Sequence, residues 1–236
     1  MYMNNKEIFQ RVELLLGEEM LNKLGEKKII IFGLGGVGSW CAESLIRTGV
    51  RHLTLVDSDN VVLSNVNRQL PATTQTIGMS KVEVLKNHFL TINPEADITA
   101  VQKMYEADTS GSFNLDTYDY IIDAIDSINS KVHLIQTACK TEAVFFSSMG
   151  AALKLDPAKI KTTEFWKVQG DPLARAIRQK FKTEEKPSKK FLCVYSEERL
   201  KNKVQSTANG TVMHVTAVFG LTLASLVIQD INKMEG

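Results

Sequence analysis

Four charged side chains have the residue types expected of a site that handles a phosphorylated ligand: Asp57, Arg68, Lys81 and Asp126. Guanidinium and ammonium groups neutralise the charge on phosphate oxygen atoms, and a carboxylate together with phosphates is a common set of ligands for Mg²⁺. Cleavage of ATP between its α- and β-phosphates would use both, because negative charge builds up on the departing pyrophosphate. A dinucleotide-dependent redox enzyme has no evident use for two cations and a second carboxylate at the phosphates.

A glycine-rich segment, GLGGVG at positions 33–38, follows a β-branched apolar run typical of a buried parallel strand. Gly33, Gly35 and Gly38 satisfy the pattern G-x-G-x-x-G, which permits a tight turn, a close approach of backbone to phosphate, and close packing of helix on strand. The following helix would present free N–H groups to an anion. Asp57 ends the next apolar strand, where a carboxylate can accept hydrogen bonds from ribose hydroxyls. A nucleotide site is therefore expected.

Further polar candidates lie in the Asn-rich connection 59–76 and after the strand that ends near Ile125. The predicted nucleotide-binding residues are Gly33, Gly35, Gly36, Gly38, Asp57, Asp59, Asn65, Arg68, Gln69, Lys81 and Asp126. The motif alone more often indicates NAD or FAD, and singly the two cations would be ordinary surface charges. The combination favours ATP over a redox dinucleotide.

These residues need a scaffold of alternating strands and helices. Strands are predicted within 28–32, 52–57, 98–102, 120–125 and 143–147, with helices following the glycine segment, at 81–91 and at about 130–140. Ser80 with Glu83 three residues later predicts a capped helix start, and Asn93-Pro94 its end. The alternation predicts an α/β fold with a doubly wound, Rossmann-like, mainly parallel sheet, and ligands at the carboxyl ends of its strands.

The pattern changes after Gly150. Polar and apolar residues alternate over 159–168, which predicts an exposed antiparallel strand, and Asp171-Pro172 predicts the start of a short helix. Residues 183–190 form a charged segment that is expected to be a mobile loop. A strand is predicted at 191–195 and a final apolar helix at 213–234. We expect residues 1–150 to form the nucleotide-binding core, and 151–236 to form a C-terminal extension packed on it as one integrated domain. The apolar stretch 215–228 is interrupted by polar residues, so a buried helix is expected and no membrane span.

The composition agrees with a globular cytoplasmic protein: 236 residues, 44% hydrophobic and 23% charged, with a net charge of +1. Residues 154–203 carry 14 basic and 7 acidic residues, so this segment could meet a polyanion, although charge runs are as often solvated surface. The cysteines Cys41, Cys139 and Cys193 are widely spaced, which argues against a zinc site and a disulfide framework. Cys193 could be a thioester-forming nucleophile, but its apolar neighbours favour a buried, inert thiol.

Four segments in order, GLGGVGSW, VDSDNVVLSNVNRQ, Gly78 to Lys81, and Asp123 to Ser127, with Arg11 before them, resemble the adenylation domain shared by ubiquitin-activating enzymes and the bacterial adenylators ThiF and MoeB. This resemblance implies that Asp57 binds ribose and that Asn65, Arg68 and Lys81 contact phosphates. It also implies that Asp126 holds Mg²⁺ and the nucleotide. Arg11 would reach the ATP of a neighbouring subunit, which implies a homodimer; a surface role on an amphipathic helix is the alternative. The implied catalytic residues are Arg11, Arg68, Lys81 and Asp126.

The C-terminal segments GDPLAR, VYSE and VTAVFG resemble the tRNA threonylcarbamoyladenosine dehydratase branch of this family, and the absence of cysteine pairs argues against the zinc-binding branches. The implied activity is ATP-dependent dehydration of a threonylcarbamoyl adenosine in tRNA through an acyl-adenylate, with ATP and Mg²⁺ as cofactors and tRNA as partner. The resemblance leaves open a sulfur-transfer protein as a further partner. The alternatives are adenylation of a ubiquitin-like or sulfur-carrier protein tail, and an NAD- or FAD-binding redox protein.

Overall fold

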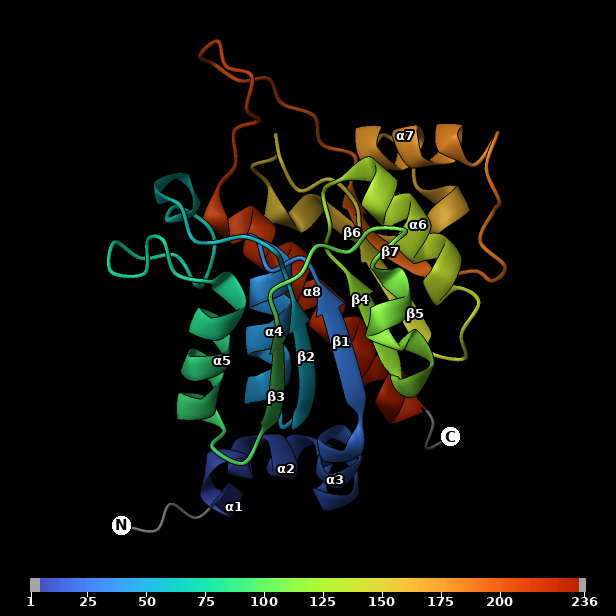
Figure 1. The fold of residues 1–236 in the computed structure, drawn as a ribbon. Helices are drawn as coiled ribbons and strands as arrows, with labels where there is room; N and C mark the ends of the chain where they lie inside the picture. The colour runs from blue at the N-terminus through green and yellow to red at the C-terminus, as the bar shows by residue number, and fades with distance from the viewer. Residues whose placement is uncertain (1–4, 234–236) are drawn as a thin grey trace.

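The structure is a computed structural model that describes residues 5–233, and in this range one seven-stranded sheet forms the centre (Figure 1). The strand order is β3-β2-β1-β4-β5-β7-β6, and every neighbouring pair is parallel except the antiparallel pair of β6 with β7. The strands are β1 (Lys28–Phe32), β2 (His52–Val56), β3 (Asp97–Val101), β4 (Tyr120–Asp123), β5 (Val144–Ser148), β6 (Ile160–Glu164) and β7 (Leu192–Ser196). The predicted doubly wound, mainly parallel sheet with a C-terminal antiparallel strand is confirmed.

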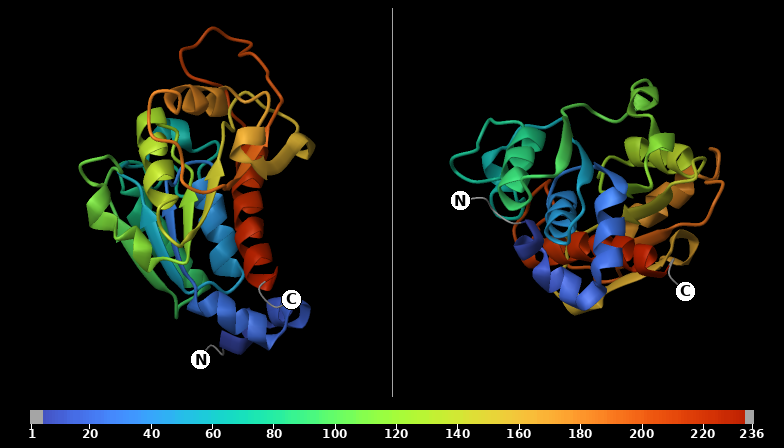
Figure 2. Two further views of the ribbon diagram at one scale, coloured as in Figure 1. Left: turned by 90° about the vertical axis from the view of Figure 1, so that its right-hand side faces the viewer. Right: turned by 90° about the horizontal axis from the view of Figure 1, so that it is seen from below.

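Helices cover both faces of this sheet. The helices are α1 (Asn5–Ile8), α2 (Gln10–Leu16), α3 (Glu18–Glu26), α4 (Gly38–Arg47), α5 (Lys81–Ile92), α6 (Ile128–Ala138), α7 (Pro172–Lys180) and α8 (Met213–Lys233), of which α1 to α3 lie at the amino-terminal ends of the strands (Figure 1). Figure 2 shows α8 along one face and α6 on the other. The last residue of the predicted final helix, Met234, lies outside the described residues. The elements after Gly150 extend the same sheet and pack on it, since β7 pairs with β5.

The core divides at the sheet into two apolar layers. Along β1, Ile29 and Ile31 pack with α4, α5 and α8, whereas Ile30 and Phe32 pack with α6 and α7. All four side chains are fully buried, as expected for a central parallel strand whose two faces are both covered. A sheet buried on both sides is a rigid base, so the segments that leave its strand ends start from fixed positions.

Helix α8 holds the glycine-rich segment in place from behind. It packs against α4, and Gly220 allows this contact, because a Cβ there would overlap the carbonyl oxygen of Val37. Thr216 lies against Gly36: a Cβ added to Gly36 would come within 3.0 Å of the Oγ1 of Thr216. By length and composition alone α8 could cross a membrane, but half of its most apolar window is buried in the protein, as in the core helix of a globular domain. The expected buried helix is thus confirmed.

Local details differ from the sequence-based expectations. Helices α2 and α3 are separated by Gly17, which has φ +84°. Ser80 does precede α5, but its hydroxyl makes no capping hydrogen bond and lies buried without a partner. The predicted strand 159–168 ends at Glu164, because its carboxylate accepts a hydrogen bond from the backbone N–H of Trp166 at 3.1 Å and starts a 3₁₀ turn, η5 (Phe165–Lys167).

The segment 183–190, expected to be a mobile loop, is anchored to α6 and to the turn that follows it. The Ser188 hydroxyl donates to the carbonyl oxygen of Cys139 at 2.6 Å. The Lys189 ammonium donates to two backbone carbonyl oxygens, at 2.5 and 2.6 Å. Backbone carbonyls that no strand or helix uses therefore find partners in this loop, which the charge pattern alone did not reveal.

Candidate active site

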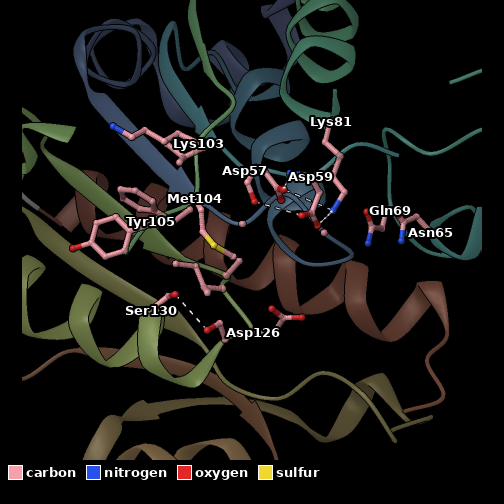
Figure 3. Close-up of a pocket in the computed structure, with 18 of the residues that line it drawn as sticks. Asp57, Asp59, Asn65, Gln69, Lys81, Lys103, Met104, Tyr105, Asp126 and Ser130 are labelled. Carbon is pink, nitrogen blue, oxygen red and sulfur yellow. Dashed lines mark hydrogen bonds and ion pairs between the residues drawn. The ribbon is translucent and has the colours of Figure 1, made fainter. Parts of the chain in front are cut away.

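A cavity of about 310 Å³ opens at the carboxyl ends of the parallel strands. It lies where the strand order reverses between β1 and β4, the usual ligand position in open α/β sheets. The segments that follow β1, β2, β3 and β4 all line it, together with the connection before α5. The lining includes Gly33, Gly35, Asp57, Asp59, Asn65, Arg68, Gln69, Lys81 and Asp126, most of which are labelled in Figure 3. Nine of the predicted nucleotide-binding residues are therefore brought together around one space.

The glycines of the motif have separable tasks. Gly33 has φ +85°, and a Cβ there would come within 2.7 Å of the carbonyl oxygen of Ala124, so the turn after β1 packs directly on the turn after β4. A Cβ at Gly38 would overlap the carbonyl oxygen of Gly33, which closes the turn as α4 begins. Gly35 faces the cavity, whereas Gly36 and Gly38 lie behind it and serve the packing of the turn. The turn brings bare backbone to the cavity wall.

Asp57 ties the glycine turn to the end of β2. Its Oδ2 accepts a hydrogen bond from the backbone N–H of Leu34 at 2.7 Å, and its Oδ1 accepts one from the N–H of Asp59 at 2.9 Å. Lys81, the first residue of α5 and only 4% exposed, places its ammonium 2.8 Å from the carboxylate of Asp59 and 3.8 Å from that of Asp57 (Figure 3). An almost buried cation with two acidic neighbours is thus fixed at the cavity.

Arg68 and the residues beside it form another wall of the cavity. Its Nη1 donates to the carbonyl oxygen of Ser64 at 2.8 Å and to Asn67 Oδ1 at 2.9 Å, while Nε and Nη2 bind nothing in the described part of the chain. Asn65 Oδ1 accepts from a backbone N–H in its own turn. Gln69 is 8% exposed, and its Oε1 is buried without a hydrogen-bond partner. A buried acceptor without a donor is costly, so a ligand or water donor is expected there.

Asp126 and Asp123, three residues apart, have opposite environments. The carboxylate of Asp126 is exposed, lines the cavity and has no partner among the described residues. Asp123 is fully buried behind it: its Oδ2 accepts from the Lys131 ammonium and from the Ser147 hydroxyl, both at 2.6 Å, and its Oδ1 accepts from the N–H of Ile125 at 3.0 Å. Asp123 therefore holds the turn that presents Asp126.

Arg11 is the one predicted catalytic residue that the structure does not bring to this cavity. It lies exposed on α2, beneath the amino-terminal ends of the strands, whereas the cavity lies at their carboxyl ends (Figure 1). The same helix exposes Leu14 by 77% and Leu15 by 83%. Within one copy of the chain, Arg11 cannot contact a ligand in the cavity.

Lys103, Met104 and Tyr105 also line the cavity and were missed from the sequence. They follow β3 directly, so the rule that placed Asp57 after β2 could have found them. The Lys103 ammonium nevertheless turns away to donate to Ser112 Oγ at 2.9 Å. The Tyr105 hydroxyl lies 2.6 Å from the Thr137 hydroxyl, and burial raises the pKa of Tyr105 to about 12, so this phenol stays neutral. These residues shape the wall and bring no free charge to it.

Cys193 is fully buried in the middle of β7, and desolvation by burial raises the pKa of its thiol well above the ordinary value. A nucleophilic cysteine needs an accessible thiolate. Cys41 and Cys139 are also buried, and none of the three is in a disulfide bond. The burial expected for Cys193 is confirmed, and the thioester alternative loses its support. Among residues 5–233 no group of three or more His, Cys, Asp or Glu side chains could hold a metal ion by itself.

The geometry separates the chemical roles around the cavity. Cationic side chains stand on the β2–α5 side, a free carboxylate on the β4–α6 side, and glycine backbone lies between them. An elongated polyanion with a sugar, such as a nucleoside triphosphate, fits this distribution of charge. None of the lining residues is a cysteine or a histidine.

Residues 9–235 match the sequence profile of the ThiF family. The tRNA threonylcarbamoyladenosine dehydratase of Bacillus subtilis (strain 168) is 41% identical over 176 residues, which are 75% of this chain and 69% of that protein. A crystal structure of E. coli tRNA N6-threonylcarbamoyladenosine dehydratase, TcdA, in complex with AMP superimposes with a TM-score of 0.91 at 33% identity, covering 98% of this chain and 96% of that one. A structure of TcdA in complex with ATP gives a TM-score of 0.90 at 32% identity, with the same coverage. The chain therefore belongs to the ThiF family, on its tRNA threonylcarbamoyladenosine dehydratase branch.

Proposed function

We propose that the protein is an ATP-dependent tRNA threonylcarbamoyladenosine dehydratase. The observation that carries this proposal is the cavity between β1 and β4, which Arg68, Lys81 and Asp126 line together with the glycine turn. The family membership supports the same activity. An NAD- or FAD-dependent redox protein would need a hydride-transfer site, and it would not need the second carboxylate and the paired cations.

In the proposed reaction, a carboxylate oxygen of the threonylcarbamoyl group attacks the α-phosphorus of ATP, and pyrophosphate departs. The resulting acyl-adenylate has AMP as leaving group, which is far better than the oxide that a free carboxylate would have to expel. A nitrogen of the carbamoyl unit, or a neighbouring atom, then attacks the activated carbonyl carbon and loses its proton, while the bond from that carbon to AMP breaks. AMP leaves with the former carboxylate oxygen, and a five-membered ring is closed. Since both reacting groups belong to one side chain, the closure has the large effective molarity of an intramolecular reaction.

The protein contributes charge and alignment to these steps. Lys81 and the free Nε and Nη2 of Arg68 would bind the phosphates and stabilise the charge that develops at the α-phosphate. Lys81 exchanges the carboxylate of Asp59 for phosphate when ATP enters. Asp57 already orders the glycine turn through Leu34 and would bind ribose, and Asn65 and Gln69 supply amide groups at the same wall, where Gln69 Oε1 still lacks a donor.

The residues present fit a magnesium ion held jointly with ATP. Mg²⁺ keeps water ligands and binds through one or two carboxylates plus substrate phosphates, so it does not need a complete protein cage. Asp126 offers an exposed carboxylate without a protein partner at the cavity, and we propose that it holds the ion. When bound, Mg²⁺ would neutralise charge on the phosphates and orient them.

We further propose that the protein acts as a homodimer in which Arg11 completes the site of the neighbouring copy. The position of Arg11 on α2, away from its own cavity, supports action in trans, and Leu14 and Leu15 offer apolar surface that a second copy would bury. Mixing an Arg11→Ala protein with an Asp126→Asn protein tests this arrangement. Mixed dimers then contain one intact site, and about a quarter of the wild-type activity should return. No recovery after subunit exchange would contradict it.

The test of the activity uses purified protein, ATP, Mg²⁺ and threonylcarbamoylated tRNA, with the nucleoside read by mass. Loss of one water from the modified adenosine, with pyrophosphate and AMP as products, is the expected result. Pyrophosphate exchange that requires a carrier protein with a Gly-Gly tail and ignores tRNA would overturn the substrate. An added arm with a sulfur-transfer protein shows whether such a partner raises the rate.

A cytoplasmic location is proposed with this substrate, and the three unbridged cysteines support it.

Two substitutions test the residue roles. Arg68→Ala and Asp126→Ala should abolish turnover while thermal unfolding stays close to wild type, because both side chains meet solvent at the cavity rim. The matched control is Lys103→Ala. Lys103 also lines the cavity, but its ammonium points away from it. Full activity in either of the first two variants would refute its assigned role.

A further inference from the structure

A second hollow, of about 520 Å³, lies on the C-terminal part of the chain between η5, α7 and the loop that follows α7. It shares no lining residue with the nucleotide cavity. Figure 1 shows α7 at the end of the molecule toward which the parallel strands point, the same end as the nucleotide cavity. Its lining residues are Trp166, Arg175, Arg178, Gln179, Phe181, Lys182 and Lys186.

The basic residues of this region divide into those that bind the protein itself and those that do not. Arg178 donates through Nη1 to two backbone carbonyl oxygens, at 2.9 and 3.2 Å, and its guanidinium lies 5.8 Å from the centre of a phenylalanine ring. Lys189 donates to two further carbonyl oxygens, and Lys180 lies 3.5 Å from the carboxylate of Glu184. These three cations hold the local structure through contacts with the protein itself.

Arg175, Lys182 and Lys186 are different. Their side chains line the hollow, and none forms a hydrogen bond or ion pair with the described part of the chain. The acidic residues of the adjoining loop offer no compensation, because Glu184 faces Lys180 and Glu185 binds Lys140 at 2.7 Å. The hollow therefore has three cations without a protein partner, beside Arg178, whose partners are uncharged carbonyl oxygens, and such an arrangement attracts a polyanion.

One aromatic side chain in the hollow is open to solvent. Trp166 is 41% exposed, although its neighbour Phe165 is fully buried. The indole is held in place by an edge contact with Phe165, at 5.1 Å between ring centres, and by a tilted contact with Phe181, at 6.1 Å. A large aromatic ring fixed by its neighbours and left partly exposed beside unpaired cations is typical of a surface on which a nucleobase stacks.

We propose that this hollow binds an unpaired nucleotide of the substrate tRNA, with a base stacked on Trp166 and the neighbouring phosphates against Arg175, Lys182 and Lys186. The proposal rests on the proposed function, since it takes tRNA as the substrate. An acidic peptide would use the three cations but gives the exposed indole no stacking partner, so single-stranded RNA fits the whole set of groups better. A loop of tRNA splays such bases out, whereas duplex RNA keeps them stacked inside.

The stacking part is tested by measuring the affinity of the full protein for a tRNA transcript. Trp166→Ala should weaken binding about tenfold, because base stacking on an aromatic side chain has this order of effect. Trp166→Phe, which keeps a stacking face, should remain within about threefold of wild type. The protein has two tryptophans, so a change of intrinsic fluorescence on tRNA binding should also be largely lost in Trp166→Phe.

The charge part is tested with the triple variant Arg175→Ala, Lys182→Ala, Lys186→Ala. If each cation meets a phosphate, the slope of log K against log salt should become shallower by about 2. Lys86→Ala is the matched control: it removes a lysine from α5, on the opposite flank of the sheet, and should leave slope and affinity unchanged (Figure 1). The affinity for ATP should stay at the wild-type value in every variant, since the two hollows share no residue.

The outcomes separate this inference from the activity on which it rests. If the variants, folded as judged by thermal unfolding, bind tRNA like the wild type, the site is overturned while dehydration by the wild type still stands. If the triple variant weakens binding but Trp166→Ala does not, the surface is a general polyanion contact and the stacking proposal is overturned. If tRNA binding depends on the hollow as expected but no dehydration occurs, the site is supported and the proposed function fails.

Discussion

Removal of the Lys131 ammonium is the perturbation whose effect the structure determines most directly. Lys131 and Asp123 are both fully buried, with Nζ 2.6 Å from Oδ2. Lys131→Met keeps most of the side-chain volume but leaves a buried carboxylate without its counterion. Breaking a buried pair from one side costs about 3–5 kcal/mol. We expect a value near the lower limit, because the Ser147 hydroxyl and the N–H of Ile125 still donate to Asp123.

The assay is urea unfolding at neutral pH, followed by circular dichroism. With an m-value of about 3 kcal/mol/M, a loss of about 3 kcal/mol lowers the midpoint by about 1 M. The double variant Asp123→Asn, Lys131→Met removes both charges and should recover at least half of this loss. Lys140→Met is the control: Lys140 pairs with Glu185 at 2.7 Å, but both side chains are more than half exposed, so the effect should stay below about 1 kcal/mol.

Two results would refute this reasoning. A Lys131→Met variant that loses less than about 1 kcal/mol would show that the remaining donors satisfy the buried carboxylate. A double variant no more stable than the single one would show that the lost packing of the lysine stem, and not the uncompensated charge, sets the cost. Because Asp123 also holds the turn before Asp126, the single variant should bind ATP more weakly as well.

Three further predictions concern other parts of the chain. Backbone hydrogen bonds from Asp156 and Leu155 lower the pKa of Glu198 from 4.5 to about 2. The stability that this carboxylate adds is therefore present above pH 4.5 and is lost as the pH falls toward 2. The melting temperatures of wild type and Glu198→Gln should differ at pH 7 and converge near pH 2. Gly38→Ala should destabilise the protein by about 1–3 kcal/mol and weaken ATP binding, because the new Cβ would overlap the carbonyl oxygen of Gly33. Gly111→Ala is the control: nothing lies within 4 Å of its Cβ, so neither stability nor ATP binding should change. Calorimetry measures both quantities for the two variants. Cys193→Ala should keep wild-type turnover at a stability cost of about 1–2 kcal/mol, and loss of turnover in a folded variant would restore the thioester hypothesis.

The sheet could be predicted from the sequence because its signals are local. Each apolar run is followed by a polar or glycine-rich segment, and parallel strands align these segments at one edge, so the position of Asp57 follows from that of β2 alone. The predicted strand ends were shifted by one or two residues. The length of β6 was overestimated, because the alternation of polar and apolar residues continues through Trp166, whereas the strand ends at Glu164, whose side chain caps the next turn. A side chain that bonds to a backbone two residues ahead leaves no trace in the pattern of hydrophobicity.

The candidate site was less predictable where it depends on pairing between distant segments. The sequence does not show that Lys81 faces Asp59, or that the Lys103 ammonium turns toward Ser112. It also could not sort the basic run between 175 and 190, in which Arg178 and Lys189 bind backbone carbonyls while Arg175 stays free. Which charge is available to a ligand depends on tertiary contacts that bring these partners together.

The contact of α8 with the glycine turn has a consequence for how the protein is made. Thr216 and Gly220 are far from Gly36 and Val37 in sequence and follow them in the chain, yet they pack against them. Translation delivers the N-terminal part first, and domains fold as their segments emerge from the ribosome. The turn at the nucleotide cavity therefore gains its backing only when α8 has left the exit tunnel. A product terminated before α8 would lack that backing, so it should bind the nucleotide more weakly than a chain that contains α8.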